Sequence, residues 1–342
     1  MVLEDALQNV AFGLVRIGSF TANAFLFGLP VLLMVVLRPS LHRDGADRAT
    51  ARMGRRLEGL VQAALWASGV GAVLTIVLQA VLVSGLADGV VGTEDLTDVL
   101  SSSFGRWHLV RLPLVVALAV MLVGKVRASS LASDDRARAP RRLWWGSWIA
   151  LAVCLLATSS FSGHAAVSSP RPLALLNDVV HLASGALWFS GIVVLAAVLP
   201  DAARALDAPR RLSFVAPIVA RFSWVALVSI GVVALTGTFN SFFNLEQPRD
   251  LVDSGYGRLL ASKIAAFLAI VVLGAINHFY VRRRLTRAAE QEQSPTAQGL
   301  FKKTIATELA LALLLMGLTG FLVGSARTRP SAAAAPVVVS SR

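Results

Sequence analysis

The sequence is poor in charge and in cysteine. Only 15% of its 342 residues are Asp, Glu, Lys or Arg, whereas a typical soluble domain carries about 25%. The single cysteine, Cys154, excludes an intrachain disulfide. The chain also lacks the nucleotide-binding pattern GxxxxGK[ST] and the catalytic patterns HExxH and GxSxG. We therefore do not expect an enzyme or a nucleotide-driven pump.

Long apolar runs take the place of the missing charge. Hydrophobic residues make up 56% of the chain and the mean hydropathy is +0.68. Because a helix needs about 20 mostly apolar residues to cross a bilayer, we predict an all-α fold, a polytopic bundle of about eight transmembrane helices surrounded by lipid. The runs cover residues 12–37, 57–84, 109–126, 143–162, 173–199, 214–243, 257–279 and 304–325.

The net charge of +12 follows the connections between these runs. Most Lys and Arg residues fall in four short segments, and the other connections are acidic or nearly neutral, which indicates membrane topology and not a nucleic-acid surface. By the positive-inside rule the basic segments are cytoplasmic, so we predict a multi-pass protein of the bacterial plasma membrane with both termini outside. The basic segments are 38–56, 125–142, 200–214 and 280–303.

The organisation expected from these runs has three parts. Residues 1–142 form an N-terminal membrane half with three helices and a cytoplasmic loop, and residues 143–325 form a second membrane region with five helices. Residues 326–342 read as a disordered external tail. The chain could also form a homo-oligomer.

Two short similarities suggest an internal repeat. Gly105-Arg106 and Arg111 recur as Gly257-Arg258 and Lys263, and Ser68 and Thr75 recur as Ser229 and Thr236 at a constant offset. Both similarities pair helices that are four apart, so the chain could consist of two four-helix repeats in the same orientation.

The segment NDVVHLASGALW at 177–188 places a carboxylate and an imidazole inside an apolar run. Asp178, His181, Gly185 and Trp188 share one helix face. Charged groups within a spanning helix are costly and usually face the bundle interior, so this face should contact protein. Asp178 and His181 could share a metal site, because carboxylate and imidazole suit copper(II), zinc or iron.

Other polar residues fall at a similar outer depth. His108 and His164 are candidate ligands beside Asp178 and His181, and the cations Arg16, Arg111 and Lys263 lie on other helices of the same layer. In the alternative interpretation, Asp178 pairs with Arg16 or Lys263 and His181 only bonds a neighbour.

Toward the cytoplasmic side the candidates are different. Glu308 and Arg221 could form a buried pair, and Cys154 and Glu308 are candidates for deeper steps of a pathway. His278 reads as an interfacial residue and His42 as a loop residue. Gly320 and Gly324 form a GxxxG pattern that permits close packing of the last helix.

These residues resemble the CopD family of copper-resistance membrane proteins. The resemblance rests on GH at 163–164, D-x-x-H at Asp178 and His181, W-x-x-G at Trp188 and Gly191, RFSWVALVSIGVVALTG at 221–237, and YGRLLASK at 256–263. Ser190 stands where the family often has glycine. The resemblance implies copper handling at the plasma membrane, with uptake from the outer face into the cytoplasm. It also implies a separate extracytoplasmic copper donor protein, because some relatives carry a copper-binding domain that this chain lacks.

Two rival functions use the same residues. A b-type haem cytochrome could be built if His181 faced His108 or His164 across the bundle. A copper-delivery partner for respiratory enzyme assembly could use the same outer site without a path through the membrane.

Overall fold

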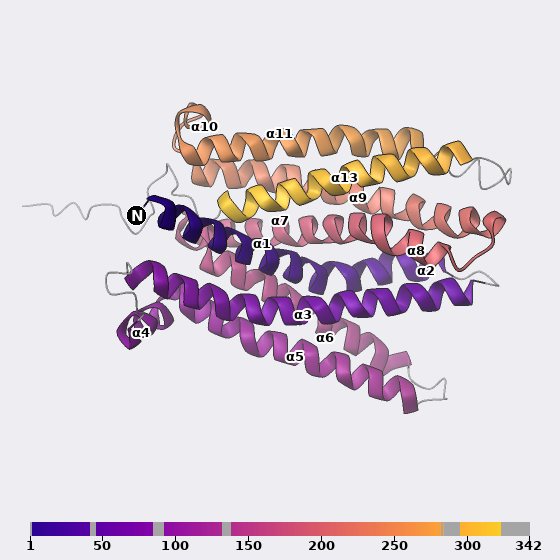
Figure 1. The fold of residues 1–342 in the computed structure, drawn as a ribbon, viewed down its shortest axis with the longest axis horizontal. Helices are drawn as coiled ribbons and strands as arrows, with labels where there is room; N and C mark the ends of the chain where they lie inside the picture. Colours follow the sequence, from indigo (N-terminus) through magenta and orange to yellow (C-terminus); the bar gives the residue numbers. More distant parts are fainter. Residues whose placement is uncertain are drawn as a thin grey trace, which may run out of the picture.

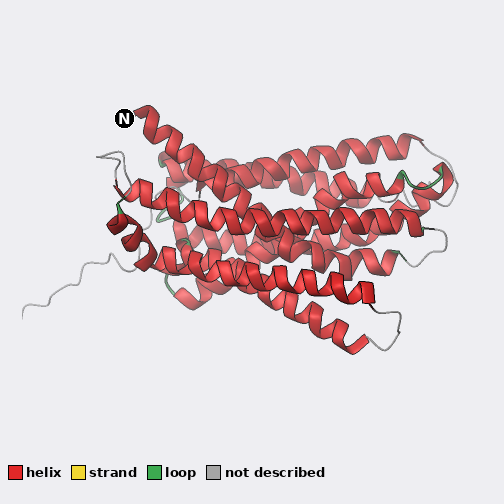
Figure 2. Cartoon of the chain, turned by 60° about the horizontal axis from the view of Figure 1, so that its bottom comes forward, coloured by secondary structure: helices red, strands yellow, loops and turns green. Residues whose placement is uncertain are grey.

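The computed structural model describes residues 2–41, 46–84, 92–131, 138–281, 283 and 295–322. In this part of the chain the structure is a bundle of long helices with no strand (Figures 1 and 2). Eight helices are long and apolar enough to cross a membrane, which confirms the predicted fold class. His42, Gly324 and the tail 326–342 lie outside the described residues.

The long helices differ slightly from the predicted runs because several continue beyond the apolar segment into polar sequence. The long helices are α1 (Val2–Leu32), α3 (Asp47–Ser84), α5 (Ser103–Leu131), α6 (Arg138–Ser162), α7 (Arg171–Val193), α9 (Ala208–Asn244), α11 (Gly255–Ile276) and α13 (Pro295–Leu322). The short ones are η1 (Leu33–Leu37), α2 (Arg38–Ser40), α4 (Thr93–Ser101), η2 (His164–Val167), η3 (Val194–Val198), α8 (Leu199–Ala203), α10 (Asp250–Asp253) and η4 (Asn277–Val281).

Helices α1 and α7 form the centre of the bundle. They contact each other extensively, and α1 also packs against α3, α6 and α13 (Figure 1). At their crossing, Gly28 of α1 lies so close to α7 that a Cβ there would overlap Ser190. The Ser190 hydroxyl donates to the Ala24 carbonyl over 3.2 Å. Ser190 therefore links the two central helices through a buried hydrogen bond.

The predicted packing residues lie at close helix contacts. Trp188 is buried, and a Cβ at Gly191 would overlap the ring of Phe222 on α9. Gly320 of α13 lies against α1, where a Cβ would be 3.1 Å from the Gly13 carbonyl oxygen. The glycine of the GxxxG pattern that the structure describes therefore lies at a close contact between α13 and α1.

The two halves of the bundle repeat local features of the backbone. Helices α1 and α7 each continue into a π-helical turn, η1 and η3, and each turn is followed by a proline, Pro39 and Pro200. A proline has no N–H to donate to the preceding turn, and a π-turn is one way to accommodate that loss. The offset between these features is the one that relates Thr75 to Thr236, and both threonines donate to the carbonyl four residues earlier over 2.6 Å.

Helices α5 and α11 also begin in the same way. The hydroxyl oxygens of Ser102 and Ser254 accept hydrogen bonds from the N–H groups of Gly105 and Gly257, at 3.1 and 2.8 Å. Each glycine packs against the preceding short helix, α4 or α10, where a Cβ would overlap a carbonyl oxygen. These recurrences support the expected duplication of a four-helix unit.

The ends of the bundle differ in character. Helices α4 and α10 lie at one end, with the start of α1 (Figure 1). At the other end, Asp201 of α8 accepts hydrogen bonds from Arg52 at 2.7 and 2.9 Å and from Arg56 at 3.1 Å, both on α3. The sequence predicts that this arginine-rich end is cytoplasmic.

Candidate functional site

Two cavities lie toward the α4/α10 end of the bundle. The first, called the arginine cavity here, measures about 490 Å³ and is enclosed by α1, α3, α4, α5 and α6. The second, called the histidine cavity, measures about 440 Å³ and is enclosed mainly by α7, α9, α11 and α13. Asp178 and His181 both line the histidine cavity, and His164 lines both cavities.

A hydrogen bond to α9 orients the imidazole of His181. Its Nδ1 lies 2.9 Å from the hydroxyl oxygen of Thr236. That hydroxyl donates its hydrogen to the Val232 carbonyl over 2.6 Å. Because a hydroxyl has one hydrogen, the Thr236 oxygen must accept from the ring, so Nδ1 carries the proton. The other ring nitrogen, Nε2, is then left with its lone pair for a metal ion.

The carboxylate of Asp178 accepts a hydrogen bond from one asparagine, which a second asparagine orients. Asn240 of α9 donates to Asp178 Oδ1 over 3.2 Å. Asn177 donates to the side-chain oxygen of Asn240 at 2.8 Å and to the Thr236 carbonyl at 2.9 Å. The bond from Asn177 fixes the amide of Asn240 so that its nitrogen faces Asp178. Asp178 and His181 are therefore both positioned by the same stretch of α9.

The rest of the histidine cavity is mostly apolar, with one cation. Lys263 of α11 lines it and interacts electrostatically with Asp178. Near the histidine, Gly237 leaves room for the ring, since a Cβ there would be 3.3 Å from His181 Cε1. A cavity lined by two imidazoles, one carboxylate and mostly apolar walls can hold a metal ion and keep water from most of its surroundings.

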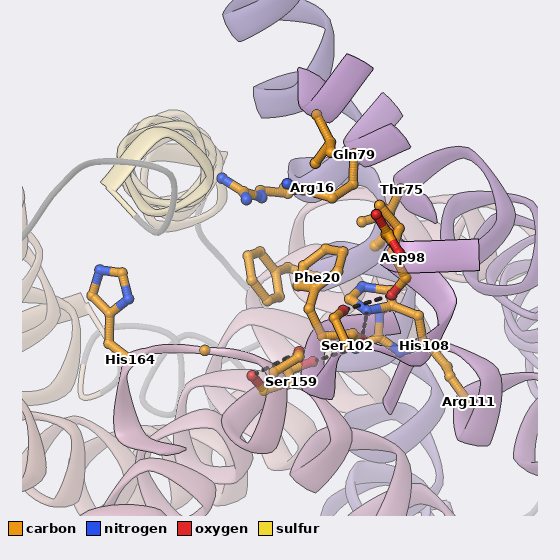
Figure 3. A pocket seen from close by; sticks show the side chains of 16 residues that line it. Arg16, Phe20, Thr75, Gln79, Asp98, Ser102, His108, Arg111, Ser159 and His164 are labelled. Atoms are coloured by element: carbon orange, nitrogen blue, oxygen red, sulfur yellow. Dashed lines mark hydrogen bonds between the residues drawn. The ribbon is translucent and has the colours of Figure 1, made fainter. Parts of the chain in front are cut away.

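The predicted set of four ligands is not assembled at one point, which corrects the sequence-based expectation for His108. That side chain is buried in the arginine cavity, where its Nδ1 lies 2.9 Å from the Phe104 carbonyl oxygen. Figure 3 shows His164 well apart from His108. Within the described residues, no group of three or more His, Cys, Asp or Glu side chains is arranged to hold a metal ion. The structure thus leaves His181, Asp178 and His164 around the histidine cavity.

The two predicted arginines belong to the other cavity. Arg16 stacks on the ring of Phe12 with its Cζ 3.9 Å from the ring centroid, and lines the arginine cavity. Arg111 donates to Thr158 and Ser159 of α6, each at 3.1 Å. Figure 3 shows Arg111 and Ser159. The ion pairs that join two described residues are all made by Asp201. A pair between Asp178 and Arg16 is therefore not observed.

Two predictions are wrong: the buried pair between Arg221 and Glu308, and the position of Cys154 on a path through the bundle. Arg221 is exposed on α9, and Glu308 accepts a hydrogen bond from Asn277 at 2.7 Å instead of pairing with that arginine. Cys154 is exposed on the outside of the bundle and does not face a path through it. A run of apolar residues predicts a helix but not its rotation, so neither orientation could be read from the sequence.

Sequence reasoning missed the polar residues of α9 that support the site. Thr236, Asn240 and Asn244 follow one another at intervals of four residues, which places them on one helix face. Asn240 and Asn244 line the histidine cavity, and Thr236 holds His181. Their regular spacing was a usable signal.

Comparisons with known proteins cover most of the chain. Residues 6–170 match the family model "Copper resistance protein D-like, N-terminal domain", and residues 216–322 match the model "Copper resistance protein D". The chain is 27% identical to a copper resistance protein D of Pseudomonas syringae pv. tomato over 334 residues, which cover 94% of this chain and 96% of that protein.

A second relative matches over a shorter region. The copper transport protein CutJ of Bacillus subtilis (strain 168) is 32% identical over 183 residues. This region covers 54% of the chain but only 31% of the Bacillus protein. No solved structure matches the chain significantly.

Proposed function

Because the chain belongs to the copper resistance protein D family, we propose that it carries copper across the bacterial plasma membrane and receives the ion in the histidine cavity. The names of the family and its relatives support a copper resistance or transport protein, and eight apolar helices support a multi-pass membrane protein. The location of the copper site and the direction of transport are our proposals.

The hydrogen bond between His181 and Thr236 carries the assignment of the site. It leaves His181 Nε2 free to bind a metal ion, as the second nitrogen of a ligating histidine usually has a fixed partner. Asp178, positioned by Asn240, supplies a carboxylate in the same cavity, and His164 supplies a second imidazole at its border. These are donor types that copper(II) accepts.

Buried polar residues between the histidine cavity and the α8 end of the bundle suggest a route for the ion. Ala312 and Met316 of α13 line the cavity, and Glu308 lies one turn further along the same helix. The Glu308 carboxylate is buried, and Asn277 of η4 donates to it. The next residue, His278, is buried with its Nδ1 2.8 Å from the Ser223 hydroxyl. Polar groups buried within a membrane bundle commonly mark ion pathways.

The direction of transport follows from the predicted topology. If the basic segments are cytoplasmic, the α4/α10 end and both cavities face outward, and copper enters from a separate extracytoplasmic donor protein. The copper gradient, or the gradient of another ion, would drive copper transport, since the sequence has no nucleotide-binding loop.

Copper accumulation in cells separates transport from its rivals. Cells that express the chain should accumulate more copper than cells that express His181→Ala, whereas His42→Ala should behave as the unmodified chain. A copper-delivery partner would bind copper without changing accumulation. A haem cytochrome would purify with iron and a haem absorption band that His181→Ala removes.

A second comparison separates the two cavities. Binding of copper(II) to the purified chain should be lost in His181→Ala and retained in His108→Gln, because His108 lies in the arginine cavity. Equal binding by His181→Ala and the unmodified chain would remove the proposed site.

A further inference from the structure

We propose that the arginine cavity is a second ligand site, related to the histidine cavity by the internal repeat, and that it binds a phosphate group. This inference goes beyond the proposed copper transport and does not depend on it. It rests on the correspondence of the two halves, on the charge of the cavity and on a buried hydroxyl, that of Ser19, which has no hydrogen-bond partner among the described residues.

The repeat relates the two cavities residue by residue. At the offset that matches η1 to η3, and Thr75 to Thr236, Ile17 corresponds to Asp178 and Phe20 to His181. Thr75 lines the arginine cavity, whereas its counterpart Thr236 holds His181 of the histidine cavity. The first half therefore has a cavity at the equivalent place but lacks the carboxylate and the imidazole that suit a metal cation.

Both halves have a cation at the equivalent position of α5 and α11, but only the second half has an acid at the position of Asp178. At the offset that relates Gly105 to Gly257, Arg111 corresponds to Lys263. Lys263 shares its cavity with Asp178, but the position equivalent to Asp178 is an isoleucine, Ile17. Arg111 is only 3% exposed, and its hydrogen bonds go to two neutral hydroxyls. A buried cation without a counter-charge is costly, so an anion in this cavity would be stabilised.

The charged residues that line the cavity are mostly cations. Arg16 lines it as a second cation, and Asp98 of α4 is the one acid among its described lining residues. Neither arginine forms an ion pair in the described part of the chain. Both arginines line the cavity (Figure 3), and their positive charge favours an anionic ligand.

A buried donor at the α1 side of the cavity provides a second, independent observation. Ser19 lines the cavity, is 5% exposed, and its hydroxyl has no hydrogen-bond partner in the described structure. Buried polar groups in folded proteins almost always have partners, so this hydroxyl indicates a missing acceptor.

The placement of the donors favours a phosphate group. Arg16 and Ser19 come from α1, Arg111 from α5 and Ser159 from α6, so donors reach the cavity from three helices. A tetrahedral phosphate accepts hydrogen bonds from several directions and pairs strongly with guanidinium. The cavity lies at the end of the bundle, where either free phosphate or the headgroup of a phospholipid could reach it.

The experiment uses the purified full chain, free of copper, with the variants Arg16→Gln and Arg111→Lys. Arg111→Lys keeps the buried charge, and Arg16 is partly exposed, so both should fold; thermal unfolding checks this. Arg106→Gln is the matched control, because Arg106 is exposed on the same helix as Arg111 and does not line the cavity. Inorganic phosphate is titrated in detergent by calorimetry, and lipids retained from phosphatidylglycerol nanodiscs are identified by native mass spectrometry.

Each outcome either supports the phosphate site or overturns it. Phosphate binding weakened by about tenfold or more in both variants, and unchanged in Arg106→Gln, supports a site for free phosphate. Selective retention of phosphatidylglycerol that both variants lose supports a lipid headgroup. Absence of both ligands, or equal binding by all variants, overturns the proposal. Copper binding by Arg16→Gln is measured in parallel, so that a failure here is distinguishable from a failure of the copper site.

Discussion

His181 on α7 donates a hydrogen bond from Nδ1 to the hydroxyl oxygen of Thr236 on α9, across 2.9 Å. This contact fixes both the orientation of the ring and the nitrogen that stays free. It links a helix of the central pair to its neighbour inside the membrane span. The proposed copper site depends on it, and the first prediction removes it.

Replacing Thr236 with valine should weaken copper binding while leaving the fold intact. Valine has the same shape as threonine but cannot accept the hydrogen from His181, so the ring loses its fixed orientation and tautomer. Removing such a supporting partner typically costs about 10–100-fold in metal affinity. Titration of copper(II) into the purified variant measures the loss.

Two variants control this prediction. Thr236→Ser keeps the hydroxyl and should bind copper nearly as well as the unmodified chain. Thr307→Val removes an exposed hydroxyl on α13 that bonds only to the Lys303 carbonyl, and it should have no effect. Normal affinity in Thr236→Val would show that the hydroxyl does not support a ligand.

Replacing Gly237 with alanine should displace the imidazole. The new Cβ would lie 3.3 Å from His181 Cε1, closer than an ordinary contact, so the ring must shift by a few tenths of an ångström. We expect weaker copper binding without loss of the folded protein. Gly231→Ala on the same helix is the matched control, because its Cβ would contact nothing within 4 Å. Equal copper affinities in the two variants would argue against a metal role for this ring.

A double-variant comparison tests whether Asp178 serves copper or only Lys263. Asp178→Asn keeps an oxygen that can accept from Asn240 but removes the charge. If Asp178 binds or attracts copper, the variant should lower copper affinity even in a chain that also carries Lys263→Gln. If Asp178 only neutralises the lysine, Asp178→Asn should reduce the thermal unfolding midpoint, and adding Lys263→Gln should restore it with no change in copper affinity.

Packing of α7 against α9 should be sensitive to a single methyl group at Gly191. A Cβ there would overlap the buried ring of Phe222, and overpacking of this kind typically costs about 1–3 kcal/mol. We expect Gly191→Ala to lower the free energy of unfolding in a detergent titration. Gly18→Ala on α1, whose Cβ would meet no atom within 4 Å, should leave stability almost unchanged. A stable Gly191→Ala would contradict the close contact.

The sequence predicted the fold and part of the site because both depend on strong local patterns. Eight apolar runs are sufficient to predict eight spanning helices, and the spacing of Asp178, His181 and Trp188 places them on one inward face. The recurrence of Gly-Arg before Arg111 and before Lys263 indicated a repeat that the matching starts of α5 and α11 now support.

The partners of these residues could not be predicted, because they depend on how each helix is rotated and which helix it contacts. His108 and His181 share a depth in the membrane, but they lie on helices that line different cavities. Arg221 and Glu308 could have met across two helices, yet Arg221 faces out of the bundle. Neither relationship leaves a signal in an apolar sequence.

The copper and iron content of the purified chain, compared with that of His181→Ala by elemental analysis, tests the account most directly. After exposure to copper(II) and removal of the excess, the unmodified chain should retain about one copper per molecule and no iron, as expected for a site with imidazole and carboxylate ligands. His181→Ala should retain none. Copper retained equally by both proteins, or iron with a haem absorption band in the unmodified chain, would contradict the proposed copper site.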